Sequence, residues 1–379
     1  MVSVVKKDLI SAVNLVSKVL KRNSEQILLL GHDHQLEIQS NRLIPHEDEL
    51  EYCGFIVNVP ATVNDSLSVD VACNQLKDCL KSCPDNIVHL DFSDDNLQIK
   101  SGGANCSIEN IPTRIKTTHF INDKPQFSIP AVVFKTLVES TAYATDPTDD
   151  RASVRGCYLR VDGKKISMIA TDTHQIAAKS LILEQDTEFS GKLLLNAKIL
   201  SDFVKIVDKK DLSAPVWIWF NDDLICLEYE NVKLSMTRYK YYFSEDNLEK
   251  NLIFEDPDFE FTCRKDYLTD SLKRLLPLLK HDDNKEIELS LHDQKIHLST
   301  EKSKFASAKS TEIIPAKTSN LGFVIRFNGK WLLNCLNFLT KCAGSFCRMQ
   351  FGDKFHPIHI VDPDLSDFKY VLCPLRCQE

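Results

Sequence analysis

Two histidines lie two residues apart in the stretch GHDHQLEIQ, at His32 and His34. On an extended strand this spacing would place both imidazoles on one face, where they could bind a metal ion. Two ligands do not complete a zinc site, and no carboxylate or cysteine follows at a recognised spacing. We therefore interpret the pair as part of an exposed turn and expect no metal.

Other patterns typical of catalysis are absent from the sequence, including a Gly-rich phosphate loop, a paired-His zinc helix and a nucleophile elbow. Asp172 and His174 resemble an acid–base pair, but nearby strand residues need not share a site. Closely spaced cysteines also lack the Cys-x-x-Cys motif. These pairs are Cys79/Cys83, Cys342/Cys347 and Cys373/Cys377. We expect a non-catalytic protein without a cofactor. A metal-dependent DNA-processing enzyme that uses the His and Asp residues is the alternative.

Composition limits the class of protein. A chain of 379 residues with 43% hydrophobic content can form two or three domains, and it has no apolar run long enough to span a membrane. The N-terminal MVSVVKKDL lacks the apolar segment of a signal peptide, so we expect a cytoplasmic protein whose 13 cysteines are reduced. The net charge of −8 disfavours nucleic-acid binding unless positive charge is concentrated locally.

One local pattern recurs six times along the chain. Its reference positions, 58 to 68 residues apart, are Val4, Val71, Ile129, Leu195, Cys263 and Phe327. The residue two positions earlier is apolar in every case, which is typical of a strand with one buried face. The residues 5, 9 and 12 positions after each reference residue are also apolar, except for one threonine at the twelfth position. These spacings are typical of a helix with one apolar face. Each unit is therefore predicted to be a strand that runs directly into an amphipathic helix.

The six units predict an α+β fold in which helices cover one face of antiparallel sheets. Two units make a domain of ordinary size. Polar, proline-containing stretches suggest the boundaries, so we expect three similar domains at residues 1–123, 124–252 and 253–379.

Positive charge is concentrated on the outer faces of these helices. If offsets 5, 9 and 12 face the sheet, then offsets 3, 10 and 14 face away from it, and those 18 positions hold nine lysines and three acids. Helix faces with mostly positive charge in an acidic chain are typical of sequence-independent contact with DNA phosphates. We favour this interpretation over an ordinary solvated surface. Including two residues that extend the first helix, the predicted DNA-binding residues are Lys7, Lys18, Lys21, Arg22, Lys81, Lys198, Lys205, Lys209, Lys273, Lys330 and Lys341.

Helix spacing limits the assembly that could enclose a duplex. Helices pack about 10 Å apart, so six in a circle leave a bore of roughly 10 Å, whereas twelve leave roughly 28 Å. A B-form duplex is roughly 20 Å wide. The chain is therefore expected to be half of a ring, closed by a head-to-tail homodimer.

Several stretches resemble the bacterial β sliding clamp, the DNA polymerase III beta subunit family. They are ATDPTDDRASVRGCYLRVDG, IATDTHQIA, FNGKWLL and YVLCPLR. The resemblance implies a clamp fold whose head-to-tail dimeric ring encircles double-stranded DNA. It implies a processivity factor that holds the replicative polymerase, the clamp loader and repair proteins by short peptides. The peptides would dock in a cleft between the second and third domains.

Carried over by motif, the cleft would hold residues from three stretches. They are Val154, Thr171, Thr173, His174, Gln175 and Ile176, then Lys240, Ser244 and Glu245, then Asn328, Trp331, Val371, Cys373, Pro374, Leu375 and Arg376. The family's TDGHRL is here Thr171–Ile176, with threonine and glutamine in place of glycine and arginine. The cleft rim is thus more polar than usual for the family. A clamp-like scaffold that binds proteins but no longer encircles DNA is a third hypothesis.

Overall fold

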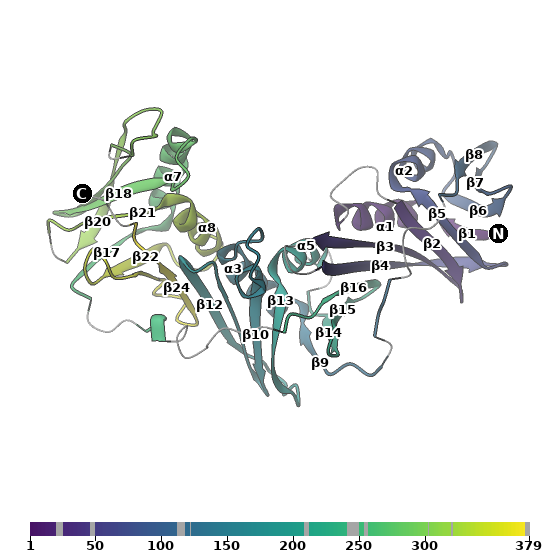
Figure 1. Cartoon of the computed structure of the whole chain (residues 1–379), viewed down its shortest axis with the longest axis horizontal. Coiled ribbons are helices and arrows are strands. Elements are labelled where there is room, and N and C mark those ends of the chain that lie inside the picture. Colours follow the sequence, from purple (N-terminus) through teal and green to yellow (C-terminus); the bar gives the residue numbers. More distant parts are fainter. Residues whose placement is uncertain are drawn as a thin grey trace. The chain divides into compact units, whose positions relative to one another are not determined.

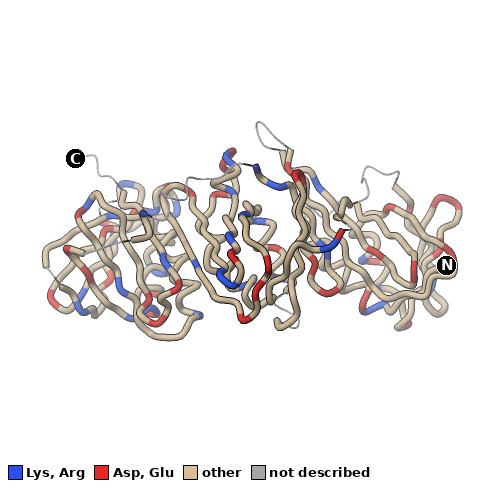
Figure 2. The backbone as a smooth tube through the Cα atoms, turned by 90° about the horizontal axis from the view of Figure 1, so that it is seen from below, with Lys and Arg blue, Asp and Glu red and all other residues tan. Residues whose placement is uncertain are grey.

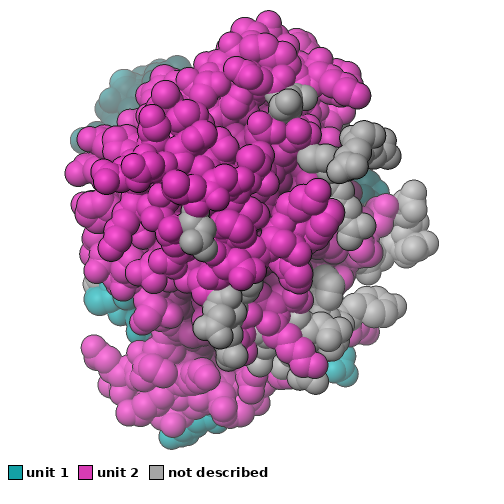
Figure 3. Space-filling model, turned by 90° about the vertical axis from the view of Figure 1, so that its left-hand side faces the viewer, with its two compact units in different colours: residues 1–135, 187–189, 199–239 teal, residues 136–186, 190–198, 240–379 magenta. Residues whose placement is uncertain are grey.

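The structure is a computed structural model that describes residues 1–19, 26–45, 50–111, 118–121, 123–207, 212–240, 250–253, 257–301, 303–319 and 321–375. The chain divides into two compact units, coloured in Figure 3. Unit 1 holds Met1–Lys135, Thr187–Phe189 and Ile199–Tyr239, and unit 2 holds Thr136–Asp186, Ser190–Lys198 and Lys240–Glu379.

All six predicted strand–helix units are present, and in each the helix begins at the residue after the strand. They are β1 (Val2–Val5) with α1 (Lys6–Val19), β5 (Leu67–Ala72) with α2 (Cys73–Ser82), β9 (Phe127–Pro130) with α3 (Ala131–Thr141), β13 (Ser190–Asn196) with α5 (Ala197–Val207), β17 (Phe259–Arg264) with α7 (Lys265–Leu275), and β21 (Val324–Asn328) with α8 (Gly329–Leu339).

The residues predicted to face the sheets form the core. Every side chain at offsets 5, 9 and 12 is at most 4% exposed, and the six reference residues of the strands are at most 2% exposed. Helices α1 and α2 contact each other in unit 1, and α7 and α8 do so in unit 2 (Figure 1). The 3.6-residue period therefore located the buried helix faces correctly.

The sheet of unit 1 is antiparallel and runs in the order β8-β7-β6-β1-β4-β16-β15-β14-β9, with β2, β3 and β5 joined to β4 through β3. Its further strands are β2 (Gln26–His32), β3 (Gln35–Pro45), β4 (Leu50–Val63), β6 (Ile87–Ser93), β7 (Asn96–Ser101), β8 (Ala104–Glu109), β14 (Pro215–Phe220), β15 (Leu224–Tyr229) and β16 (Val232–Thr237).

The sheet of unit 2 is also antiparallel, in the order β13-β10-β11-β12-β24-β23-β22-β17-β20-β19-β18-β21. Its further strands are β10 (Gly156–Asp162), β11 (Lys165–Thr171), β12 (Gln175–Ile182), β18 (Glu286–His292), β19 (Lys295–Ser299), β20 (Thr311–Thr318), β22 (Phe346–Phe351), β23 (Ile358–Val361) and β24 (Phe368–Leu372). Short helices complete the unit at η1 (Ala142–Ala144), α4 (Ala152–Arg155) and η2 (Leu276–Leu279).

Strand pairing crosses both predicted domain boundaries. β4 pairs with β16 at Val57 and Val232, and β12 pairs with β24 at Ile176 and Val371. Each continuous sheet therefore joins strands that the sequence assigns to neighbouring domains, which explains why internal contacts group the chain into two units. The division into three domains stays a prediction.

A buried ion pair lies at the start of α7. The ammonium of Lys265 lies 2.5 Å from a carboxylate oxygen of Asp362, and the two side chains are 3% and 0% exposed. Lys265 also donates to the carbonyl oxygens of Leu339, Ala343 and Gly344. This one side chain thus ties α7 to the end of α8 and to the loop after β23.

No helix in the described part of the chain is long and apolar enough to cross a membrane.

Candidate functional site

A hollow of about 350 Å³ lies in unit 2, where the turn between β11 and β12 meets the start of α8. Its walls come from the loop around η1 and α4, from that turn, and from the first two turns of α8. The lining residues are Tyr143, Thr145, Asp146, Asp149, Arg151, Asp172, Thr173, His174, Gln175, Lys330, Trp331 and Asn334.

The carboxylate of Asp172 organises the turn. Its oxygens accept from the backbone N–H groups of His174 and Gln175, each at 2.9 Å, and from the Gln175 side-chain amide at 2.7 Å. The Gln175 amide oxygen in turn accepts from the hydroxyl of Tyr370 at 2.6 Å. Asp172 is therefore committed to backbone hydrogen bonds, and it is not the base of an Asp–His pair.

Two aromatic rings form one wall of the hollow. The imidazole of His174 stacks on the indole of Trp331, with ring centroids 5.3 Å apart and planes at 13°. Asn328 fixes the position of Trp331, because its side-chain oxygen accepts from the N–H groups of Lys330 and Trp331 and so caps α8. The stack presents a flat surface to a ligand in the hollow.

Other residues of the lining carry charge of both signs. Arg151 donates two side-chain hydrogen bonds to Asp149, at 2.9 and 2.8 Å. These bonds lower the pKa of Asp149 to about 2, so its carboxylate is charged at any physiological pH. Asp146 is held by Thr148, whose N–H and hydroxyl both donate to it. The lining of the hollow thus contains acidic and basic side chains, and none of the three is among the predicted cleft residues.

The segment after β24 lies beside this turn. The N–H of Cys373 donates to the carbonyl oxygen of His174 at 2.8 Å, and the N–H of Leu375 donates to that of Arg326. The Cys373 thiol is half-buried, and burial raises its pKa. The last described residues are therefore fixed against the hollow by backbone hydrogen bonds.

The predicted basic helix faces are exposed, but acids lie next to them. Lys7, Lys81, Lys205, Lys273, Lys330 and Lys341 are exposed, and Lys198 is half-buried. Three of these lysines approach an aspartate three residues earlier: Lys81 to Asp78 and Lys205 to Asp202, each at 2.9 Å, and Lys273 to Asp270 at 4.0 Å. Figure 2 shows basic and acidic positions mixed along the backbone. The net positive charge is consequently smaller than the predicted positions alone suggest.

Comparison with known proteins identifies the family. A model of the DNA polymerase III beta subunit, central domain, matches residues 128–238, and one of its C-terminal domain matches residues 250–376. Together they span more than half of the chain. The chain belongs to the DNA polymerase III beta subunit family.

Relatives and solved structures of this family match three quarters of the chain or more. The beta sliding clamp of Rickettsia felis is 20% identical over 98% of both chains, and that of Escherichia coli K12 is 21% identical over 76% of both. The sliding clamp of Bacillus subtilis superposes with a TM-score of 0.83 at 18% identity, covering 99% of both chains. The beta subunit of Pseudomonas aeruginosa gives 0.82 at 18% identity and covers 100% of both. The predicted clamp fold is confirmed.

Within this clamp fold the structure brings part of the predicted cleft together. Thr173, His174, Gln175 and Trp331 line the hollow, and Asn328 caps the helix that carries Trp331. Other predicted cleft residues do not line the hollow. Val154, Thr171 and Val371 are at most 3% exposed, and Ile176, Pro374 and Leu375 are half-buried. Lys240 is exposed and lies outside the hollow. Several predicted residues lie outside the part that the structure describes, namely Lys21, Arg22, Lys209, Ser244, Glu245, Arg376 and the side chain of Lys18.

Besides Lys330, seven lining residues were not predicted for the cleft, namely Tyr143, Thr145, Asp146, Asp149, Arg151, Asp172 and Asn334. Most belong to ATDPTDDR, a stretch already quoted for its resemblance to the clamp family. Lys330, which was predicted to face DNA, also lies on the rim of the hollow. The longer resembling stretch, ATDPTDDRASVRGCYLRVDG, therefore pointed to most of these lining residues, but only Val154 from it was assigned to the cleft.

The departure from the family's TDGHRL has a structural cost at Thr173, which stands where the family has glycine. Its φ is 74°, in the left-handed region that β-branched residues avoid. Its exposed side chain makes no hydrogen bond among the described residues, while its N–H donates to the hydroxyl of Thr171 at 3.0 Å. The turn geometry is thus retained although the residue is unsuited to it.

Replacing Thr173 by glycine is expected to stabilise the protein by about 1 kcal/mol, because glycine adopts positive φ without the clash of a Cβ. The midpoint and slope of urea unfolding measure the effect. Thr62→Gly in the regular strand β4 is the matched control, and it should destabilise instead. A loss of stability in Thr173→Gly would contradict the claim of strain.

Of the histidine pair, His34 lies in an exposed turn, as predicted, whereas His32 is the last residue of β2 and is half-buried. His34 has a φ of 64° and follows Asp33 at the tip of the hairpin between β2 and β3. His32 contacts the carboxylates of Asp33 and Glu37, each at 3.3 Å. Across the described residues, no group of three or more His, Cys, Asp or Glu side chains could hold a metal ion. No observation therefore favours the alternative of a metal-dependent enzyme.

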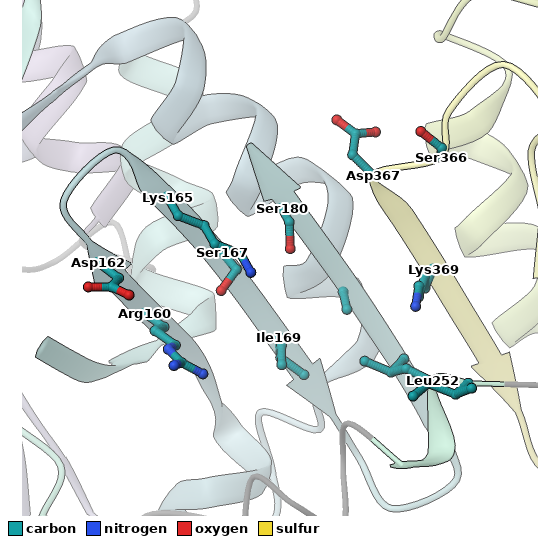
Figure 4. Close-up of a pocket in the computed structure, with 12 residues that line it drawn as sticks. Arg160, Asp162, Lys165, Ser167, Ile169, Ser180, Leu252, Ser366, Asp367 and Lys369 are labelled. Atoms are coloured by element: carbon teal, nitrogen blue, oxygen red, sulfur yellow. The ribbon is translucent and has the colours of Figure 1, made fainter. Parts of the chain in front are cut away.

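A second hollow, of about 420 Å³, lies against β10, β11, β12 and β24 (Figure 4). Asp367 on its wall pairs with the buried ammonium of Lys179 at 2.6 Å, and Asp162 accepts from the hydroxyl of Ser190. Its lining comprises Arg160, Asp162, Lys165, Ser167, Ile169, Ala178, Ser180, Leu252, Ile253, Ser366, Asp367 and Lys369. None of these is a predicted cleft residue.

Proposed function

We propose that the chain is a DNA sliding clamp, a non-catalytic processivity factor that encircles duplex DNA. Membership in the beta subunit family carries this proposal, and the six strand–helix units support it. In the proposed assembly, domains 1–123, 124–252 and 253–379 form half of a ring, and a second copy closes it head to tail. Twelve helices would then surround the duplex, and their exposed lysines would contact phosphates without reading sequence.

Topology should hold such a ring on DNA. We expect the clamp, once loaded by its clamp loader, to remain on nicked circular plasmid and to leave within seconds when a restriction enzyme linearises it. Gel filtration of the labelled clamp with plasmid measures retention before and after cutting. Equal retention on both forms would contradict encirclement and favour a scaffold that binds only proteins.

The hollow beside His174 is proposed as part of the cleft that holds the replicative polymerase, the clamp loader and repair proteins through short peptides. Peptide recognition in a groove needs apolar surface with a few polar anchors. The His174–Trp331 stack supplies the surface, while Arg151, Asp149 and Lys330 supply charged anchors. Because these anchors have both signs, the partner peptide should carry charges of both signs around an apolar residue.

Trp331→Ala is expected to weaken polymerase binding about 30-fold or more, because a central tryptophan in an interface commonly contributes 2 kcal/mol or more. Surface plasmon resonance with the immobilised clamp measures the affinity, and the length of products on a primed circular template reports processivity. Asn337→Ala, at an exposed position of the same helix, is the control. Unchanged affinity in Trp331→Ala would remove the hollow from the cleft.

A further inference from the structure

Three neighbouring strands of unit 2 place two cations in one cross-strand row. Thr262 on β17 lies opposite Lys317 on β20 and opposite Arg348 on β22. Residues directly opposite one another point to the same face of a sheet. The two cations therefore flank the Thr262 hydroxyl, and their backbones are about 10 Å apart, twice the spacing between strands.

Neither cation has a partner in the described part of the chain. The Nε of Arg348 is buried without a hydrogen bond, and no carboxylate there pairs with Arg348 or Lys317. A buried donor that remains unsatisfied is costly, and guanidinium groups bind carboxylate or phosphate oxygens in most proteins. This row therefore has the donors for an anionic group that the fold itself does not provide.

Two exposed aromatic rings flank the row. Phe346 is 49% exposed and lies opposite Arg264, and Tyr267 at the start of α7 is 47% exposed. Arg264 makes a bidentate ion pair with Asp266, and its guanidinium lies 5.0 Å from the centre of the Tyr267 ring. Arg264 thus has its charge compensated and serves to orient one of the two rings.

The row and the rings border a shallow hollow of about 880 Å³, large enough for several groups of a polymer. One acid, Asp293 in the turn between β18 and β19, also lines it. The uncompensated cations Lys317 and Arg348 outnumber it. We name this surface the β17 face, defined by Thr262, Arg264, Tyr267, Lys317, Phe346 and Arg348.

We propose that the β17 face binds single-stranded DNA, with phosphate oxygens at Lys317 and Arg348 and unpaired bases on Phe346 and Tyr267. Cations beside exposed aromatic rings are the combination that single strands require, since each base has a flat face free to stack. The bases of a duplex are stacked on each other and cannot reach the rings. An acidic peptide would satisfy the cations but would leave both rings without a matching group. The site is distinct from the helix lysines, and it does not depend on encirclement.

The test uses the full-length chain and a fluorescein-labelled 12-nucleotide oligothymidylate, followed by fluorescence anisotropy. Phe346→Ala is expected to weaken binding about 5- to 150-fold, the effect of losing one stacked base. Lys317→Ala combined with Arg348→Ala should lower the slope of log affinity against log salt by about 1.4, or about 0.7 for each lost phosphate contact. Unchanged thermal unfolding of the variants would exclude a folding defect.

Two controls separate this site from other sources of affinity. Lys304→Ala removes an exposed lysine of the same unit that does not belong to the β17 face, and it should leave binding unchanged. Lys205→Glu with Lys341→Glu alters the helix faces, and it should impair loading on plasmid while sparing oligothymidylate binding. Binding that falls with the helix variants and not with the β17 variants would overturn the proposal. So would tighter binding of a glutamate-rich 12-residue peptide to the same residues.

Discussion

Reversing the charge of Lys7, Lys205 and Lys341 to glutamate is expected to reduce loading of the ring onto circular DNA by several orders of magnitude at 100 mM salt. Each reversal replaces an attraction to phosphate by a repulsion, and the three residues belong to three different helix regions. If each lysine contacts one phosphate, the slope of log affinity against log salt should fall by about 2.7, or about 0.9 for each contact. Nitrocellulose filter binding to nicked plasmid between 50 and 200 mM salt measures the slope.

The ion pairs along these helices determine how strongly each single charge reversal affects DNA binding. Lys7 and Lys341 have no acidic partner in the described residues, whereas Lys205 is paired with Asp202 at 2.9 Å. Lys205→Glu alone should therefore weaken binding less than Lys7→Glu. Lys304→Glu changes the net charge equally but lies outside the helix faces, so it is the control. An equal loss in Lys304→Glu would mean that only the net charge matters and that the helix faces are merely solvated.

Replacing Lys265 by methionine is expected to lower the free energy of unfolding by about 3–5 kcal/mol. The change leaves the Asp362 carboxylate buried without a counter-ion, and it also removes the donor to three carbonyl oxygens. Chemical denaturation followed by circular dichroism measures the loss.

The double variant Lys265→Met with Asp362→Leu should recover much of this loss, because an apolar pair of similar volume can replace a buried ion pair. Lys81→Met, which breaks an exposed pair with Asp78, should cost less than about 1 kcal/mol. If the double variant is less stable than Lys265→Met alone, the carboxylate contributes through bonds other than the ion pair, and our account of this pair is wrong.

The elements of the fold were predictable because each depends on residues close together in sequence. A side chain at offset 5 or 9 of a unit is buried whenever its helix forms, so Leu9 and Leu336 could be assigned to the core from periodicity alone. Sheet order was not predictable by that route. The pairing of Ile176 with Val371 joins strands almost 200 residues apart, and nothing in either strand's own pattern specifies its partner.

The candidate cleft was predictable only as far as motifs could be matched. His174 and Trp331 were expected in one cleft, and they stack. Their contact depends on a cap at Asn328 and on a turn organised by Asp172, which no spacing rule connects. Similarly, counting lysines by offset ignored Asp78 and Asp202, because those acids stand at positions that the count did not include. The net charge of a helix face depends on the neighbouring residues of the helix surface as well as on the residues that point directly outward.

The pairing of β12 with β24 also determines when the cleft can form during synthesis. The Tyr370 hydroxyl that holds Gln175 is contributed 195 residues later. At about 5–20 residues per second, a ribosome makes the second half of this contact roughly 10–40 s after the first. Until then β12 has an unpaired edge, which is prone to pair with other chains. A chain still in synthesis therefore lacks the completed form of the proposed cleft, and translation that stops before Phe368 should yield a chain that aggregates.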